Sequence, residues 1–430
     1  MKKKVLIISY YWPPAGGISP LRIVKFVKYL REFNWEPIVC VPQKADYLYF
    51  DDTYYKDIPE NLEILKTKII EPFKAYKILS GRGKNATNNP VYGNNTKRSK
   101  IDELAIWIRG NLFIPDARAL WIKPTVKYLS KYLEKNKVDA ILTDGPPHTN
   151  TVIGMRLSQK FSIPWLADFQ DPWTQVDYYK LLKISKWADK KHKKLEQEVF
   201  KTAAKITIAS PTWAKDLESI GAKNVDVIYY GYDEDDFKNI KPQKDNDSFI
   251  ISHAGIMGID RNPETLFEAL RDLAGEDKNF ARKLKIIFAG PVDLTVKETI
   301  KKYNLENNYI ELGNIKRKDA LQLNANSDIL LLPINKADNA KGRIPGKLYE
   351  YLRIGNPILS FGPTDSDVAN IINETKSGIT IPYDDYDNIK KFVTDIFYNR
   401  AKFEPVNIEK FSNRNQTKKI AEFLNEISEK

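Results

Sequence analysis

Short apolar runs alternate with helical segments along this chain, and this alternation limits the possible folds more than any other feature. Residues 5–9 form an apolar run that is followed by a loop with two glycines and then by helical periodicity over residues 21–33. Later runs have the same strand-like character: residues 138–142, 162–167, 206–209, 249–253, 285–289, 329–332 and 358–361. Because parallel strands need a crossover between them, usually a helix, this order predicts an α/β fold built from doubly wound sheets.

The chain length divides these strands between two domains. A chain of 430 residues exceeds what one hydrophobic core ordinarily holds, and two domains of roughly 200 residues each fit this length. An acidic stretch at residues 231–247 follows the first series of strands and is the expected linker. We therefore place the first domain at residues 1–235 and the second at residues 236–407, with a final amphipathic helix at about residues 408–430.

The segment KGRIPGKLYEYLRIGNP, residues 341–357, carries the clearest functional pattern. Pro345 suits the first turn of a helix, because its fixed φ angle fits there and its missing N–H would have no partner in any case. Gly355 is a typical helix stop. We expect a helix of about three turns in this segment, followed by a buried strand at residues 358–361.

Charged side chains gather at the start of that helix. Lys341 and Arg343 precede it and Lys347 lies in its first turns, where free backbone N–H groups and the helix dipole also favour an anion. Glu350 follows Lys347 by three residues on the same face, and its carboxylate can accept two hydrogen bonds from a ribose diol. A phosphate site and a ribose site together describe a nucleoside diphosphate. The competing interpretation is an ordinary surface ion pair between Lys347 and Glu350 beside a core tyrosine.

A second glycine loop, at residues 254–263, is another candidate anion site. Asn262 is a typical N-cap residue and Pro263 a typical first helical residue, so we expect a helix to begin there. The free N–H groups of that helix would again favour an anionic ligand.

His148 lies just after the strand at residues 138–142, and it is one of only three histidines in the chain. Ligands of open α/β sheets bind at the carboxyl ends of the strands, so this position suits a site. An imidazole near neutral pH can take or hold the proton of a reacting hydroxyl. The alternative, which the sequence leaves open, is that His148 only caps the next helix.

The formal net charge of +12 favours an anionic partner. Phosphorylated substrates and an anionic membrane surface fit this charge, and we expect no nucleic-acid partner because the chain lacks zinc-finger spacing, an RNA-recognition aromatic motif and a heptad-backed basic region. On the helix at residues 21–33, one side carries cations that we expect to face solvent or lipid headgroups: Arg22, Lys25, Lys28 and Arg31.

The sequence predicts a cytoplasmic location, with peripheral contact to the inner face of the cell membrane as an option. No apolar run approaches the ~20 residues that a membrane span requires, and the N-terminal residues lack a cleavage site of the signal-peptide type. The single cysteine, Cys40, lies in an apolar run, where burial is a sufficient explanation for it.

Residues 350–358, EYLRIGNPI, resemble the donor-binding helix of GT-B glycosyltransferases of the retaining family 4, which usually reads E-A-M-A-x-G-x-P-V. Gly342 stands where most of that family has the first glutamate of an E-x7-E pair. The form R-I-P-x-K-L-Y-E-Y and the segment DFQDPW, residues 168–173, resemble a bacterial polysaccharide-biosynthesis branch in which arginine is commoner at the place of Gln170.

This resemblance implies the GT-B fold: two doubly wound Rossmann-like domains facing a central cleft, with a C-terminal helix that crosses back to the first domain. It implies a transferase of the hexosyltransferase type that moves a sugar from a nucleotide diphosphate sugar to a hydroxyl of a glycan or lipid-linked acceptor, with retention of configuration. The pathway would be the biosynthesis of a surface polysaccharide such as lipopolysaccharide or capsule. Neither a metal ion nor another cofactor would be required.

The resemblance also implies donor-binding residues. Gly16 and Gly17 would lie under the donor diphosphate, although a plain tight turn also explains a glycine pair. Gly258 would let the backbone approach the diphosphate, and Arg261 would clamp it. Lys347 would be the partner cation and Glu350 would orient the nucleotide.

The acceptor hydroxyl would be guided by His148 or Asp168, because both follow strand ends. Two rival functions remain open from the sequence. One is a nucleotide-sugar epimerase on the same fold, and the other is a non-catalytic protein that binds a glycan or a surface.

Overall fold

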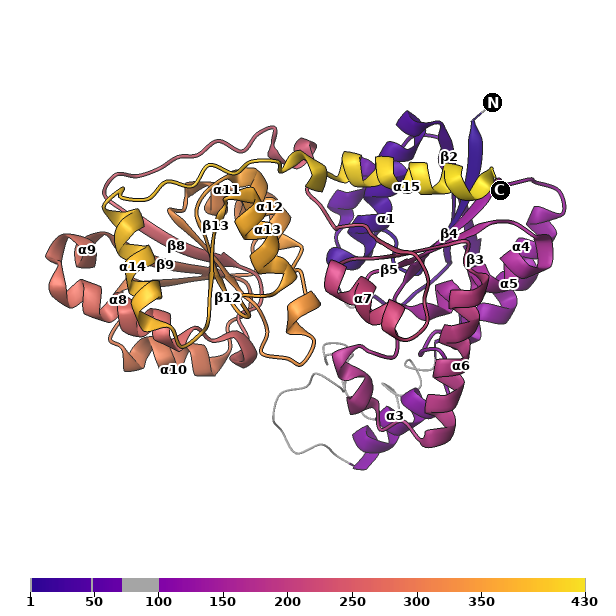
Figure 1. The fold of residues 1–430 in the computed structure, drawn as a ribbon, viewed down its shortest axis with the longest axis horizontal. Helices are drawn as coiled ribbons and strands as arrows, with labels where there is room; N and C mark the ends of the chain where they lie inside the picture. Colours follow the sequence, from indigo (N-terminus) through magenta and orange to yellow (C-terminus); the bar gives the residue numbers. More distant parts are fainter. Residues whose placement is uncertain (1, 48, 72–99, 430) are drawn as a thin grey trace. The chain divides into compact units, whose positions relative to one another are not determined.

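The computed structural model describes residues 2–47, 49–71 and 100–429, with residues 100–102 described by their backbone alone. The chain forms two compact units (Figure 1). The first contains Met1–Tyr229 and Asn413–Lys430, and the second contains Tyr230–Ser412. The units divide between Tyr229 and Tyr230, a few residues before the predicted boundary at 235/236.

The first unit contains a seven-stranded parallel sheet in the order β3-β2-β1-β4-β5-β6-β7. Its strands are β1 (Lys3–Ile8), β2 (Trp35–Pro42), β3 (Glu63–Thr67), β4 (Ala140–Gly145), β5 (Trp165–Phe169), β6 (Lys205–Ile208) and β7 (Val225–Val227). Its helices are α1 (Ile18–Leu30), α3 (Lys100–Asn111), α4 (Ile122–Leu133), α5 (His148–Phe161), α6 (Lys186–Thr202), α7 (Pro211–Ser219) and α15 (Asn413–Ser428).

Alternate residues of the strands pack against helices on opposite faces of this sheet, as the two-residue period of a strand requires. In β1, Val5 and Ile7 join the core formed with α1 and α15, while Leu6 and Ile8 join the core formed with α4, α5, α6 and α7. The sheet is therefore buried on both faces, which explains why its strands read as continuous apolar runs in the sequence.

The C-terminal helix α15 belongs to the first unit, as the predicted fold requires. Its buried residues pack on α1, and Trp35 Nε1 donates a hydrogen bond to Asn425 Oδ1 at 3.2 Å. Arg414 forms an ion pair with Glu32 at 2.6 Å. The chain thus completes its first unit with its last helix (Figure 1).

The second unit contains a six-stranded parallel sheet in the order β10-β9-β8-β11-β12-β13. Its strands are β8 (Phe249–Ala254), β9 (Leu284–Ala289), β10 (Tyr309–Gly313), β11 (Ile329–Pro333), β12 (Ile358–Phe361) and β13 (Gly378–Ile381). Its helices are α8 (Glu264–Glu276), α9 (Lys278–Lys283), α10 (Leu294–Lys302), α11 (Arg317–Asn326), α12 (Lys347–Ile354), α13 (Asp367–Thr375) and α14 (Tyr386–Phe397).

Both sheets reverse their strand order once, and the reversal locates the expected ligand site in each. The order reverses between β1 and β4 in the first unit and between β8 and β11 in the second. Open α/β sheets bind ligands at the carboxyl ends of the strands beside such a reversal. The loops after β1, β4, β8 and β11 are therefore the places to look for functional side chains.

The predicted exposure of the basic side of α1 is wrong for its first two cations. Arg22 and Lys25 are each 1% exposed. Lys25 Nζ lies 2.7 Å from Asp57 Oδ2, and Lys28 Nζ lies 3.0 Å from Asp57 Oδ1. Because ion pairs within the unit occupy these side chains, α1 does not present them to lipid headgroups. In the part of the chain that the structure describes, no helix combines the length and the apolar character needed to cross a bilayer.

Candidate functional site

The short helix α12 places Lys347 at its first position. Gly346 is the N-cap residue and Gly355 ends the helix with a φ angle of 87°, as predicted for a glycine stop. Pro345 was expected in the first turn but precedes the N-cap, and the helix has eight residues, fewer than predicted. The backbone N–H groups of the first turn and the Lys347 side chain therefore lie at the same end of α12.

The ammonium group of Lys347 points into the second unit. Its Nζ lies 3.1 Å from Nε2 of His253, the penultimate residue of β8. It also lies against Gly255, where a Cβ atom would be only 2.3 Å from Nζ. Gly255 has a φ angle of 140°, which other residues rarely adopt. The backbone conformation thus favours glycine at position 255, and an added Cβ atom would force the Lys347 ammonium group to move.

His253 bridges the two strands at the reversal of the second sheet. Its Nδ1 lies 3.0 Å from the carbonyl oxygen of Leu331 in β11. Because a carbonyl oxygen can only accept, Nδ1 carries the proton and Nε2 offers a lone pair to Lys347. Burial, together with the nearby Lys347 charge, lowers the pKa of His253 well below its usual value, so the ring is neutral.

The ammonium group of Lys347 lies in surroundings that are unusual for a cation. Within the described residues, no carboxylate lies within ion-pair distance of its Nζ, and the predicted alternative of a Lys347–Glu350 surface pair is wrong. Burial and the nearby Arg261 lower the pKa of Lys347 to about 7, although Glu350 opposes this shift. Near neutral pH this lysine is therefore poised between its charged and uncharged forms.

Arg261 lies at the end of the short 3-10 helix Ile259–Arg261, in the loop after β8. Its Nε and Nη2 lie 3.2 Å and 3.3 Å from the carboxylate oxygens of Asp260. A Cβ atom on Gly258 would come within 2.6 Å of Asp260 Oδ1, although the extended backbone of Gly258 suits any residue. The glycine therefore leaves room for the side chains that follow it.

The helix start predicted at Asn262 and Pro263 is shifted by one residue. Helix α8 begins at Glu264, with Pro263 as N-cap residue. The Asn262 side chain instead donates a hydrogen bond to Thr299 Oγ1 at 2.8 Å, so it does not cap the helix.

Glu350 lies on α12 but faces a neighbouring helix. Its Oε1 forms an ion pair with Nη1 of Arg317 in α11 at 2.7 Å. Nη2 of Arg317 also lies 3.3 Å from Oδ2 of Asp236. The side chain of Glu350 is 18% exposed. Of the cations expected near this helix, Lys341 pairs with the exposed Asp365.

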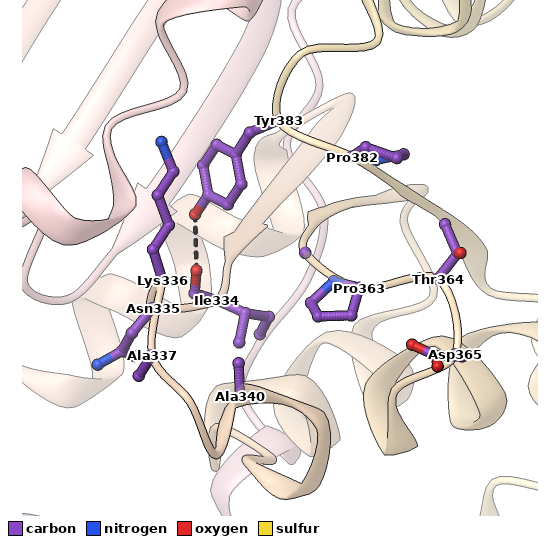
Figure 2. Close-up of a pocket in the computed structure, with 11 residues that line it drawn as sticks. Ile334, Asn335, Lys336, Ala337, Ala340, Pro363, Thr364, Asp365, Pro382 and Tyr383 are labelled. Carbon is purple, nitrogen blue, oxygen red and sulfur yellow. Dashed lines mark hydrogen bonds between the residues drawn. The ribbon is translucent and has the colours of Figure 1, made fainter. Parts of the chain in front are cut away.

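A pocket of about 400 Å³ opens at the carboxyl ends of β11, β12 and β13 (Figure 2). Tyr383 forms part of its wall and donates a hydrogen bond to the carbonyl oxygen of Ile334 at 2.8 Å, drawn as a dashed line in Figure 2. Lys336 Nζ lies 4.4 Å from the centre of the Tyr383 ring, and the Lys336 backbone N–H donates to the Asp260 carbonyl oxygen at 3.0 Å. The pocket therefore adjoins the loop that carries Arg261.

In the first unit, His148 is the first residue of α5 and is 5% exposed. Its ring stacks on Trp173 with centres 4.6 Å apart. It does not cap the helix: Pro147 is the N-cap residue, and Nδ1 has no hydrogen-bond partner in the part of the chain that the structure describes. Burial, helped by His192, lowers the pKa of His148 to about 3, so the ring is neutral. His148 also lines a small pocket of about 60 Å³ beside Trp173 and His192.

Asp168 is held in the interior of the first unit. Arg22 donates two hydrogen bonds to its carboxylate, at 2.7 Å and 2.8 Å, and Thr207 donates a third at 2.6 Å. Both oxygens of Asp168 therefore have partners within the protein. Its neighbour across the strands, Asp144, is 0% exposed, and burial together with Asp168 raises the pKa of Asp144 to about 8.

The glycine pair after β1 forms a turn before α1. Gly17 is the N-cap residue of α1 and has a φ angle of 87°, and its carbonyl oxygen accepts a hydrogen bond from the Tyr54 hydroxyl at 3.1 Å. The Gly16 N–H donates to the Tyr49 carbonyl oxygen at 2.8 Å. The turn explains the glycine at position 17, and a role toward the donor diphosphate stays a prediction for both.

The structure brings Lys347, Arg261 and Gly258 together at the reversal of the second sheet, and it keeps Glu350 on the same helix as Lys347. Sequence reasoning missed His253 and Gly255, although a histidine directly before a glycine loop was visible. Across the described ranges, no group of three or more histidine, cysteine, aspartate and glutamate side chains is arranged to hold a metal ion.

Comparisons with known proteins concern the domain and the fold. Residues 233–415 match the family model described as glycosyl transferases group 1, a span that nearly coincides with the second unit. No curated protein has a significant match to the sequence.

Solved structures resemble nearly the whole chain. The sucrose-phosphate synthase from Thermosynechococcus elongatus is 13% identical, with a TM-score of 0.55, and the match covers 99% of this chain and 94% of that one. The lipopolysaccharide outer core galactosyltransferase WaaB is 13% identical, with a TM-score of 0.56 and coverages of 98% and 99%. A UDP-N-acetylglucosamine 2-epimerase is 13% identical, with a TM-score of 0.50 and coverages of 98% and 95%.

At such low identity these likenesses show the fold alone, and they confirm the expected GT-B class for the two doubly wound sheets. The family model goes beyond the fold, because it describes a group 1 glycosyl transferase. Residues 233–415 thus match the group 1 glycosyl transferase model, within a chain of GT-B fold.

Proposed function

We propose that this protein is a retaining glycosyltransferase of family 4 that moves a sugar from a nucleotide diphosphate sugar to a hydroxyl of a glycan or lipid-linked acceptor. The proposed pathway is bacterial surface polysaccharide biosynthesis, which the resemblance of residues 341–358 and 168–173 supports. The observation that carries the proposal is the position of Lys347, whose ammonium group meets the glycine loop at the reversal of the second sheet.

Donor binding is assigned to the second unit. Lys347, Arg261 and the positive end of the α12 dipole neutralise the diphosphate, and Gly258 leaves room beside Arg261. Glu350 accepts from the ribose hydroxyls with its second oxygen, while Arg317 holds the first. The pocket in Figure 2 is the proposed place for the sugar, since it adjoins the loop of Arg261.

The chemical step breaks the bond between the anomeric carbon and the diphosphate oxygen and forms a bond from that carbon to the acceptor oxygen on the same face, while the proton of the acceptor hydroxyl passes to the departing diphosphate oxygen. Negative charge develops on the leaving diphosphate, and prearranged cations and N–H groups stabilise it without reorganisation. In this proposal these groups suffice and no metal ion is required.

Acceptor recognition is assigned to the first unit, and there we favour His148 over Asp168. The neutral His148 ring can accept or donate a hydrogen bond to a hydroxyl, whereas both Asp168 oxygens already accept from Arg22 and Thr207. Because the pKa of His148 is about 3, the ring orients the hydroxyl without keeping its proton.

A thermal-shift screen of UDP-, GDP- and ADP-sugars tests the proposal, because a ligand that binds only the folded protein raises its unfolding temperature. The sugar nucleotide that binds is then incubated with and without acceptor glycans, in the presence of EDTA. Consumption of the donor only with acceptor supports glycosyl transfer. Conversion of the donor without acceptor would instead indicate an epimerase, and binding without any turnover a non-catalytic protein.

A further inference from the structure

We infer that His253 is a positioning residue for Lys347, and that binding of a nucleotide diphosphate sugar draws a proton from solvent onto Lys347. This inference rests on the proposed donor site and adds a residue and a proton-linked control of affinity to it.

His253 fixes the position of the Lys347 ammonium group. Its Nζ lies 3.1 Å from Nε2 of His253, and the ring of His253 is itself fixed by the Leu331 carbonyl at 3.0 Å. His253 is 1% exposed, so the imidazole cannot turn away without breaking a buried hydrogen bond. The position of the ammonium group is therefore set by strand β8 rather than by the lysine's own flexible stem.

The charged groups that face Lys347 do not neutralise the positive charge of its ammonium group. From the loop after β8 comes Arg261, a second cation, whose own carboxylate partner is Asp260. From α12 comes Glu350, which is already paired with Arg317 of α11. From β8 comes the neutral His253. In this arrangement an anionic ligand is the missing partner of the lysine.

Ligand charge and lysine charge are therefore linked. Before binding, burial and Arg261 hold the pKa of Lys347 at about 7. A diphosphate beside Nζ raises that pKa again, because an opposite charge favours the protonated form. Above about pH 7 the protein must therefore take up a proton as the donor binds, and affinity falls by up to about tenfold for each further pH unit.

Calorimetric titration at pH 8, in buffers of different ionisation enthalpy, counts the protons taken up. The probe is whichever of UDP-glucose, GDP-mannose and ADP-glucose binds, since the diphosphate of a sugar nucleotide does not itself titrate near this pH. We expect an uptake of about 0.9 proton per donor for the wild type, from a lysine with a pKa of about 7. The variant Lys347→Met removes this uptake, whereas Lys391→Met, on the exposed face of α14, leaves it unchanged.

Variants of the histidine separate positioning from folding. His253→Leu frees the lysine to reach solvent and regain its ordinary pKa, so uptake falls below about 0.2 proton and affinity loses its pH dependence. His253→Gln keeps an acceptor for Nζ and restores most of the uptake. A folded His253→Leu protein with wild-type uptake overturns the positioning role. If His253→Leu does not fold, the Lys347→Met result still decides the proton linkage.

The two proposals fail in different ways. Donor binding without proton uptake in the wild type overturns this inference and leaves the proposed function standing. Absence of binding for all three sugar nucleotides overturns the donor site itself, and with it this inference.

Discussion

In the proposed donor site, the side chains of Lys347 and His253 lie close to Gly255, which has no side chain of its own. The ammonium group of Lys347 occupies the space that a Cβ atom on Gly255 would fill, at 2.3 Å. Nε2 of His253 contacts the same ammonium group at 3.1 Å. A methyl group added at position 255 would therefore displace the Lys347 ammonium group.

We expect Gly255→Ala to weaken donor binding at least tenfold, because the added methyl group displaces Lys347 and the backbone is strained at a φ angle of 140°. The matched control is Gly275→Ala on α8, where a Cβ atom meets nothing within 4 Å. That change should leave affinity unaltered and stabilise the helix by about 0.5–1 kcal/mol. Equal donor affinity in both variants would contradict the assigned position of Lys347.

Asp144 gives the first unit a pH-dependent stability. Its folded pKa of about 8 lies above the ordinary value of 3.8, so the folded state keeps a proton that the unfolded state has released. Stability should therefore fall as pH rises from about 4 to about 8, by up to roughly 1.4 kcal/mol per pH unit. Asp144→Asn removes this slope, and urea unfolding at pH 5, 6, 7 and 8 measures it. A wild type and variant with parallel pH profiles would show that Asp144 does not titrate in this range.

A local pattern pointed to Lys347, which lies beside a glycine at a helix start, and the family resemblance pointed to Arg261; the roles of both stay predictions. Sequence patterns missed His253 because a histidine within an apolar strand looks like core, and its partner Leu331 lies 78 residues away. The burial of Arg22 was equally hidden, since Asp168 follows it by 146 residues. Contacts between residues so far apart in the sequence depend on the order of the strands in the sheet. No local sequence pattern specifies that order.

Among the elements, α12 and the two glycines at its ends decide where the Lys347 cation and the positive end of the helix dipole lie. Helix α12 is only eight residues long, and Gly355 ends it in the left-handed region. Short helices have little stability of their own, so their ends matter. Its first residue could not be fixed from the sequence, because Pro345 and Gly346 are both acceptable before a helix.

Gly355→Ala should destabilise the second unit by about 1 kcal/mol, because alanine is unfavourable at a φ angle of 87°. Gly355→Asn should cost less, since asparagine tolerates this conformation better. Urea denaturation of both variants gives the comparison. Two variants with wild-type stability would mean that the helix end adapts without strain.

Most strands were visible as apolar runs because both faces of the sheets are buried. The edge strand β3 was not, since its residues alternate between exposed and buried positions and form no continuous run. The positions of the elements that carry the proposed site could thus be predicted from the sequence. The edge strand β3 of the first sheet could not.

At the scale of the whole molecule, the last helix ties the end of the chain to its beginning. Leu424 of α15 is 0% exposed and lies in the core with α1. Leu424→Ala should cost about 2–5 kcal/mol of the first unit's stability, because a buried leucine is replaced by a cavity. The control Leu294→Ala, at a residue that is 67% exposed, should change stability by less than about 0.5 kcal/mol. Hydrogen exchange should show lost protection in α1 and none in α12, and the reverse would contradict the assignment of α15 to the first unit.

The central claim is that the second unit binds the diphosphate of a sugar nucleotide through Lys347. The most direct measurement is the dissociation constant of that donor at pH 7 for the wild type, Lys347→Ala and Lys190→Ala, the last on the exposed side of α6. We predict a loss of at least tenfold for Lys347→Ala, as expected when a cation that contacts a phosphate is removed, and none for Lys190→Ala. Comparable affinities for the two variants would contradict the claim.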